Sequence, residues 1–163
     1  MNATMQSGTT RNGTESYRAT HAVPGTILLV EDEEAVREVT REALEMGGYH
    51  VLTAEGAPAA LHIVCDESTA IDLLLTDVVM PGMNGPELAR QVNVIRPELA
   101  TLFMTGYAEN EILRLATLGT TQKHIKKPFT VHSLLAGVAK ALAARWKDGN
   151  DNQDIQDPQH PSS

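Results

Sequence analysis

The sequence predicts an α/β fold in which helices cover both faces of a five-stranded parallel sheet. The first supporting observation is that short, mostly apolar runs of strand length alternate with segments of helical periodicity. Strands that alternate with helices in this way are typical of parallel sheets. The second is that 163 residues with an apolar fraction of 42% suit one domain with a hydrophobic core.

The first four predicted strands are mostly apolar, and the fifth has one aliphatic residue, Ile125. In chain order they are TILLV (26–30), YHVLTA (49–54), IDLLLT (71–76), LATLFM (99–104) and QKHIK (122–126). Nearly continuous apolar runs of this length are expected where a strand is buried on both faces.

Helical patterns follow several of these strands. One helix is predicted to end at Gly47-Gly48, with an apolar face of Val36, Val39, Ala43 and Met46. Pro86, directly after Gly85, suits the first position of a helix over residues 86–95. A last helix is expected behind an N-cap at Thr130. Its apolar stripe consists of Val131, Leu134, Leu135, Val138 and Leu142.

The two ends of the chain differ in composition from its middle. Residues 1–25 are rich in Thr, Gly, Asn and Ser, and residues 148–163 read DGNDNQDIQDPQHPSS. Neither segment can bury enough apolar surface to offset the entropy lost on ordering. We therefore expect disordered tails at 1–25 and 148–163 around one folded domain of residues 26–147.

Charge and cysteine content exclude several classes of function. The net charge of −8 disfavours nonspecific binding to nucleic acids or anionic lipids, because both need a positively charged surface. Cys65 is the single cysteine, so no disulfide can form within the chain, and we expect it to be a small buried residue. No membrane span or signal peptide is visible, which predicts a cytoplasmic protein.

Asp77 occupies an unusual position directly after an apolar strand, between Leu74-Leu75 and Val78-Val79. An ionised carboxylate in an apolar setting is costly unless it is paired, hydrogen-bonded or bound to a metal. Asp77 is therefore expected at a strand end or with a partner.

Other reactive side chains follow the predicted strands in the same way. Glu31 and Asp32 follow the first strand, Thr105 the fourth and Lys127 the fifth. Ligands of open parallel sheets bind outside the carboxyl ends of the strands, so these residues are expected to converge with Asp77 on one site.

Each residue also has a simpler interpretation. The acidic run EDEE (31–34) could interact with a helix dipole, Thr105 could belong to an ordinary turn before Gly106, and Lys127 could be a solvated surface lysine. Their shared place at one edge of the sheet favours a site over these separate interpretations.

The side chains have a definite combined chemistry. Neighbouring carboxylates repel each other, which raises their affinity for protons or for a hard cation such as magnesium. A carboxylate can attack phosphorus to give an aspartyl phosphate, while a hydroxyl and an amine, here Thr105 and Lys127, hold the remaining oxygens.

Four motifs resemble the receiver domain of two-component response regulators, in the order and spacing of that family. They are VEDE (30–33), LLLTDVVMPGMNG (73–85), MTGYAE (104–109) and KKPF (126–129). The resemblance covers about residues 26–143. It implies a flavodoxin-like fold with strand order 2-1-3-4-5.

The resemblance also implies roles for individual residues. Asp77 would be the phosphoacceptor, and Asp32, Asp77 and the backbone carbonyl of Val79 would bind Mg2+, with Glu31 acting through water. Thr105 and Lys127 would contact the phosphoryl group.

The family's mode of action implies partners as well. A histidine kinase or a histidine phosphotransfer protein would donate the phosphoryl group. The new contacts would then change a protein-binding surface around helix 4, strand 5 and helix 5. No DNA-binding output domain is expected, because only about twenty residues follow residue 143.

One residue departs from the family pattern. Three residues before Lys127 the family usually has Tyr or Phe as a switch residue, whereas this chain has His124. His124 either packs in place of the aromatic ring, or it gives a switch in which the coupling to phosphorylation is altered or depends on pH. Tyr107, two residues after Thr105, could take over part of the aromatic role.

Three alternative functions are weaker. A Mg2+-dependent phosphatase of the dehalogenase type also has an aspartyl nucleophile, but it usually carries a second carboxylate two residues later, where this chain has Val79. An FMN carrier would not place EDEE beside a phosphate. A phosphorylation-independent interaction module would not need the acceptor, metal and lysine positions that this chain retains.

Overall fold

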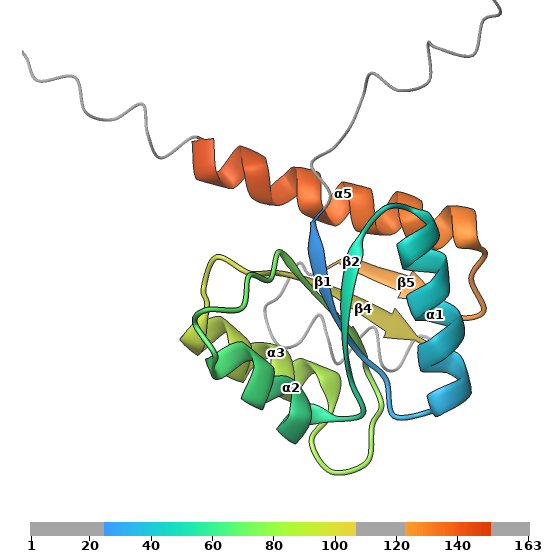
Figure 1. The fold of residues 1–163 in the computed structure, drawn as a ribbon, viewed down its shortest axis with the longest axis horizontal. Coiled ribbons are helices and arrows are strands. Elements are labelled where there is room, and N and C mark those ends of the chain that lie inside the picture. The colour runs from blue at the N-terminus through green and yellow to red at the C-terminus, as the bar shows by residue number, and fades with distance from the viewer. Residues whose placement is uncertain (1–24, 107–122, 151–163) are drawn as a thin grey trace, which may run out of the picture.

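The computed structural model describes residues 25–106 and 123–150 (Figure 1). Its elements are β1 (Thr26–Val30), α1 (Glu34–Met46), β2 (His50–Ala54), α2 (Ala57–Cys65), β3 (Leu73–Asp77), α3 (Gly85–Ile95), β4 (Ala100–Thr105), β5 (Lys123–Lys126) and α5 (Val131–Asn150). Tyr107, Gln122 and the predicted helix 4 lie outside the described residues, as do most of the two predicted tails. Helix α5 itself continues beyond residue 147, where the sequence predicted a tail.

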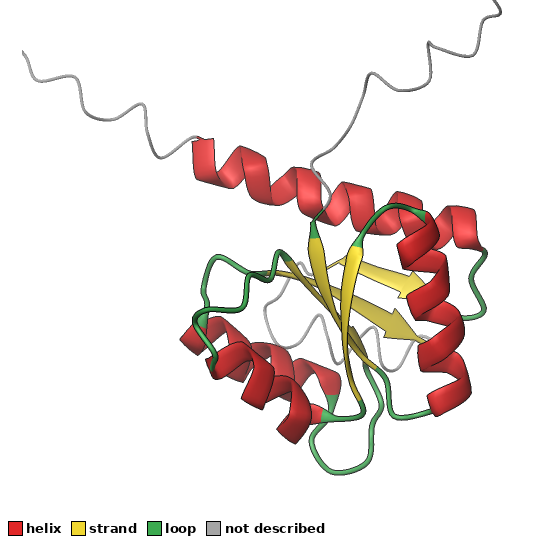
Figure 2. Ribbon diagram, in the orientation of Figure 1, coloured by secondary structure: helices red, strands yellow, loops and turns green. Residues whose placement is uncertain are grey.

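The five strands form one parallel sheet in the order β2-β1-β3-β4-β5, which confirms the predicted fold. Helices α1 and α5 cover one face of the sheet, and α2 and α3 cover the other (Figure 1, Figure 2). Because the strands run in the same direction, their carboxyl ends lie along one edge of the sheet. In register, Val30 is opposite Thr76, Asp77 opposite Met104, and Thr105 opposite Lys126.

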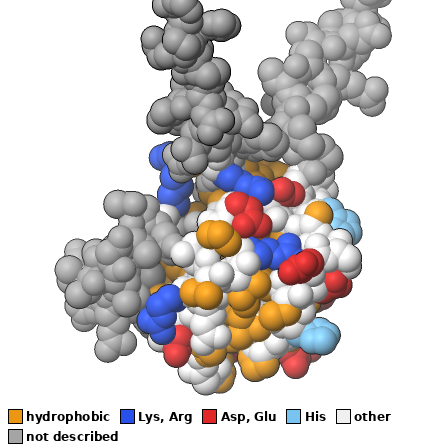
Figure 3. Space-filling model, turned by 90° about the vertical axis from the view of Figure 1, so that its left-hand side faces the viewer, with side chains coloured by type: hydrophobic (Ala, Val, Ile, Leu, Met, Phe, Trp, Pro, Cys, Tyr) orange, Lys and Arg blue, Asp and Glu red, His pale blue; other side chains and the backbone are white. Residues whose placement is uncertain are grey.

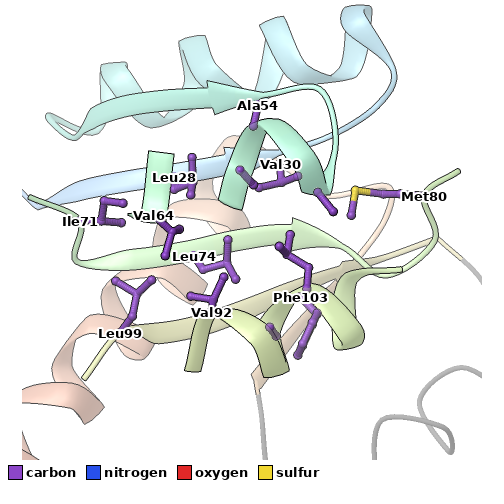
Figure 4. Close-up of a cluster of buried hydrophobic side chains, with 14 of the residues drawn as sticks. Leu28, Val30, Ala54, Val64, Ile71, Leu74, Met80, Val92, Leu99 and Phe103 are labelled. Carbon is purple, nitrogen blue, oxygen red and sulfur yellow. The ribbon is translucent and has the colours of Figure 1, made fainter. Parts of the chain in front are cut away.

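Two hydrophobic clusters, one on each face, explain the continuous apolar runs. Leu28 and Val30 of β1 point into the cluster beneath α2 and α3, which Figure 4 shows together with Leu74 and Phe103. The alternate residues of the same strand belong to the cluster beneath α1 and α5. A strand with both faces covered can accept an apolar residue at every position.

The buried face of α1 differs from the predicted one. Val39 and Met46 are 67% and 80% exposed, whereas Thr40, Ala43 and Leu44 are buried. Thr40 can face the core because its hydroxyl donates to the carbonyl of Val36 at 2.7 Å. An apolar pattern alone misses this face, since it treats Thr as a solvent-facing residue. Gly47 is the C-cap of α1, as predicted.

Helix α2 was not predicted, because its sequence APAALHIVC is apolar almost throughout and shows no clear face. Cys65, its last residue, is exposed, so the prediction that it is buried was wrong. A helix end next to a polar turn brings even an apolar side chain to the surface. Among the described residues, no helix combines the length and the apolar character needed to cross a membrane.

Helix α3 begins with an N-cap, Asn84, in addition to the predicted Pro86. The side chain of Asn84 accepts a hydrogen bond from the backbone N–H of Glu87 at 2.9 Å, and Pro86 lies in the first turn.

Helix α5 has the predicted cap, since the hydroxyl of Thr130 accepts from the N–H of Ser133 at 3.1 Å. The stripe of α5 is buried at Leu134, Val138 and Leu142, but Val131 is exposed at the helix start. On the face seen in Figure 3, hydrophobic side chains lie among charged side chains of both signs.

Candidate functional site

The polar residues predicted to form a site lie together at the carboxyl edge of the sheet. Glu31 directly follows β1, Asp77 is the last residue of β3, Thr105 is the last residue of β4, and Lys127 directly follows β5. The backbone N–H of Lys127 donates to the carbonyl of Thr105 at 2.7 Å, which fixes the two residues side by side.

Lys127 is the centre of the arrangement. Its Nζ donates to Glu31 Oε2 at 2.7 Å and to Asp77 Oδ2 at 2.9 Å. The side chain of Asp77 is 13% exposed, so one oxygen is paired with an ammonium while solvent still reaches the group. Asp77 therefore has both the strand-end position and the partner that its sequence context demands.

The β1–α1 loop holds the other two carboxylates. Glu31 is 1% exposed, and its Oε1 accepts from the N–H of Glu33 at 3.2 Å. Asp32 is exposed. One carboxylate oxygen from each of Glu31, Asp32 and Asp77 lies within 4.8 Å of the other two.

This oxygen set suits a hard divalent cation. Magnesium is commonly bound by one or two carboxylates and completes its shell with water and substrate phosphate. Lys127 forms ion pairs with two of the three carboxylates, those of Glu31 and Asp77, whereas the nearby Arg37 donates only to backbone carbonyls of the loop. Among the described residues, the carboxylates at this edge therefore outnumber the cations. The residues present therefore fit Mg2+ by charge and by donor type.

The protonation of the buried groups reflects the same electrostatics. Burial raises the pKa of Glu31, although the hydrogen bonds from Lys127 and from the backbone of Glu33 act in the opposite direction. Burial by itself would lower the pKa of Lys127, but its hydrogen bonds to Glu31 and Asp77 outweigh this effect and raise it. Both directions favour added positive charge in the site, and Lys127 stays cationic at neutral pH.

The side chains of Thr105 and Val79 differ in exposure. Thr105 is fully buried at the end of β4, whereas Val79, two residues after Asp77, is 51% exposed. Beyond Thr105, a Cβ on Gly106 would meet nothing closer than Lys127 Cδ at 4.0 Å.

The predicted switch residues are only partly placed. His124 lies exposed on β5, in register with the fully buried Phe103. Tyr107 lies outside the described residues.

Two residues that were not predicted from the sequence, Thr76 and Arg37, support the site. The hydroxyl of Thr76, fully buried, donates to the backbone carbonyl of Asp77 at 3.1 Å. Arg37 Nη1 donates to the carbonyl of Glu31 at 2.8 Å and so holds the β1–α1 loop from the first turns of α1. A cation near a helix N-terminus opposes the helix dipole, and this is the signal that could have marked Arg37.

The comparisons with known proteins agree on one kind of domain. The family model described as the response regulator receiver domain matches residues 27–139, a segment that contains every residue of the site. The chain is 37% identical to the response regulator receiver protein CpdR of Brucella abortus, over 72% of this chain and 97% of that protein.

A sensor kinase and a solved structure give similar matches. The chain is 37% identical to the sensor kinase CckA of Brucella abortus, over 72% of this chain but only 12% of that protein. The crystal structure of a CheY-like response regulator receiver domain protein from Methanospirillum hungatei has a TM-score of 0.69 at 30% identity, and covers 77% of this chain and 99% of that one. The same domain thus occurs alone and as a small part of a longer protein.

Proposed function

The chain belongs to the response regulator receiver domain family, and on this basis we propose that it is a signalling switch that accepts a phosphoryl group on Asp77. The donor is a phosphohistidine of a histidine kinase or of a histidine phosphotransfer protein. The protein acts as an acceptor that is reset by loss of the phosphate, rather than as an enzyme that turns over a substrate.

The observation that carries this proposal is the double contact of Lys127 with Asp77 and Glu31. In the transfer, a carboxylate oxygen of Asp77 forms a bond to phosphorus while the bond from phosphorus to the donor nitrogen breaks. The imidazole keeps the electron pair and takes up a proton. Because the ammonium lies 2.9 Å from the acceptor carboxylate, it can neutralise a phosphoryl oxygen without a large movement.

We assign the metal-binding role to Asp32, Asp77 and the backbone carbonyl of Val79, with Glu31 acting through water. Bound Mg2+ supplies charge neutralisation between the carboxylates and the incoming phosphoryl oxygens. Asp32 is exposed and can reach a cation from the solvent side. Glu31 is buried, and its side chain is held by the ion pair with Lys127.

The output of the switch is a change in protein binding. Thr105 is buried at the end of β4, the strand beside β5. Phosphorylation draws its hydroxyl toward the phosphate, and this movement alters how the side chains of β4 and β5 pack. His124 is exposed on β5, so a partner can read a change at that residue directly. We propose a protein partner in the cytoplasm, since the net charge of −8 does not favour nucleic acid or an anionic membrane surface.

A phosphatase function is less well supported by the site. The residue two positions after Asp77 is Val79, which offers methyl groups where a dehalogenase-type phosphatase usually has a second carboxylate. The carboxyl group that usually protonates the leaving alcohol in that class is therefore missing at this position.

Incubation with acetyl phosphate tests the proposal. The wild type should gain a hydroxylamine-labile phosphate only when Mg2+ is present, and Asp77→Asn should gain none. Asp72→Asn is a matched control, because Asp72 lies at the other end of β3 and should leave the labelling intact. Labelling of Asp77→Asn at the wild-type level would overturn the proposed function.

A further inference from the structure

The loop that follows Asp77 is closed by backbone hydrogen bonds at both ends. The N–H of Val78 donates to the carbonyl of Met104 in β4 at 3.0 Å. The carbonyl of Val78 accepts from the N–H of Gly85 at 2.9 Å. Gly85 is the first residue of α3, so the start of this helix is tied directly to the end of the acceptor strand.

There is no space for a side chain at Gly85, which is buried. A Cβ at this position would overlap the carbonyl oxygen of Asp77, and it would lie 3.0 Å from the carbonyl carbon of Asp77 and 3.1 Å from Cα of Val78. These are backbone atoms, so no rotamer change can relieve the overlap. The same carbonyl oxygen accepts a hydrogen bond from the hydroxyl of Thr76 at 3.1 Å.

Helix α3 cannot easily move away to make room. Its first turn is fixed by Asn84, whose side chain accepts from Glu87 N and whose carbonyl accepts from Leu88 N at 3.0 Å. Leu88 and Val92 are buried in the cluster beneath α2 and α3. A displaced helix would open this close-packed cluster, so a clash at Gly85 acts mainly on the backbone of Asp77 and Val78.

We propose that Gly85 and Thr76 are positioning residues that hold the backbone of Asp77, and through it the turn to Val79, in the geometry needed to bind Mg2+. The inference rests on the proposed function and names the residues that set the metal affinity of that site. They act through the acceptor backbone and touch no reacting atom.

The test is the affinity of the unphosphorylated protein for Mg2+, measured by calorimetry. Gly85→Ala should bind Mg2+ about tenfold more weakly, as is typical when a residue that supports a metal ligand is changed. Its acetyl phosphate labelling should then need correspondingly more Mg2+.

Gly47→Ala is the matched control. A Cβ at Gly47 would overlap a methyl group of Leu135, but Gly47 ends α1, at the edge of the sheet opposite the site. This variant should lower the thermal stability and leave the Mg2+ affinity unchanged. If Gly85 had only a structural role, Gly85→Ala would likewise lose thermal stability and keep its Mg2+ affinity. An unchanged Mg2+ affinity in folded Gly85→Ala would therefore overturn the inference.

Thr76→Val decides the matter if Gly85→Ala does not fold. It removes the hydroxyl while nearly keeping the side-chain volume. It should also weaken Mg2+ binding, because the carbonyl of Asp77 loses the hydrogen bond from Thr76. Unchanged affinity in Thr76→Val would then overturn the inference. Failure of the wild type to take up phosphate with Mg2+ would instead refute the proposed function itself.

Discussion

Strand β3 lies between two aspartates that each form an ion pair, yet the two pairs have different surroundings. Asp72 precedes the strand and binds Arg145 of α5, with Oδ1 to Nη1 at 2.7 Å. Its other oxygen accepts from the N–H of Thr26 at 2.8 Å. Asp77 ends the strand and binds Lys127, with Oδ2 to Nζ at 2.9 Å.

The difference lies in the balance of charge. At Asp72 one carboxylate faces one guanidinium, and a backbone N–H satisfies the second oxygen. At Asp77 one ammonium pairs with two carboxylates, those of Asp77 and Glu31, and the carboxylate of Asp32 lies beside them. A balanced pair can only support the fold, whereas a surplus of negative charge favours a further cation. This surplus supports the proposal that Asp77 accepts a phosphoryl group with the help of a bound cation.

Replacing the cationic partner of each aspartate should give the largest difference in the free energy of unfolding between the two ends of β3. Lys127→Met leaves Glu31 buried without its partner, and we expect it to lower the free energy of unfolding by about 3 kcal/mol. Arg145→Met breaks a half-exposed pair and should cost about 1 kcal/mol or less. Denaturant unfolding without Mg2+ measures both values. Equal losses of unfolding free energy in the two variants would contradict the difference in burial and charge balance between the two ion pairs.

Neutralising the aspartates should give effects of opposite sign. Asp72→Asn should lower the free energy of unfolding by about 1 kcal/mol, because two charge-assisted hydrogen bonds are weakened. Asp77→Asn should raise it by up to about 1 kcal/mol, because repulsion from Glu31 and Asp32 is relieved. The same denaturation experiment measures both, and destabilisation by Asp77→Asn would contradict a charge surplus at that end.

Alkaline pH should produce the smallest difference. Because the pKa of Lys127 is raised above its usual value of 10.5, its ion pairs contribute fully below that pH. The contribution is lost as the pH rises through the raised pKa. Arg145 keeps its charge throughout, so the Asp72 end adds no such slope. The free energy of unfolding should fall more steeply above pH 10.5 in the wild type than in Lys127→Met, and parallel curves would contradict this.

The sequence was sufficient to predict the sheet and the edge of the sheet at which the candidate residues gather. The central strands β1, β3 and β4 are buried on both faces, so their apolar runs stand out. The polar residues that follow the strands of a parallel sheet share one edge. From this rule alone, Glu31, Asp77, Thr105 and Lys127 are expected to lie together, as they do in the structure.

Features that depend on packing could not be predicted in this way. The buried face of α1 includes Thr40, whose hydroxyl is satisfied by its own helix, so hydrophobicity alone gives the wrong face. The contact of Gly85 with the carbonyl of Asp77 depends on how closely α3 approaches β3, which no local pattern encodes. In the sequence, Gly85 was visible only as the last residue of the motif LLLTDVVMPGMNG (73–85) and as the residue before Pro86.

The most direct test of the central claim is to identify the residue that carries the phosphate. The protein would be treated with acetyl phosphate and Mg2+ and then reduced with borohydride, which converts an aspartyl phosphate into homoserine. Mass spectrometry of the peptides should find homoserine at position 77 and unmodified aspartate at positions 32 and 72. Homoserine at either of those positions, or a phosphate on another residue while Asp77 stays unmodified, would contradict the account.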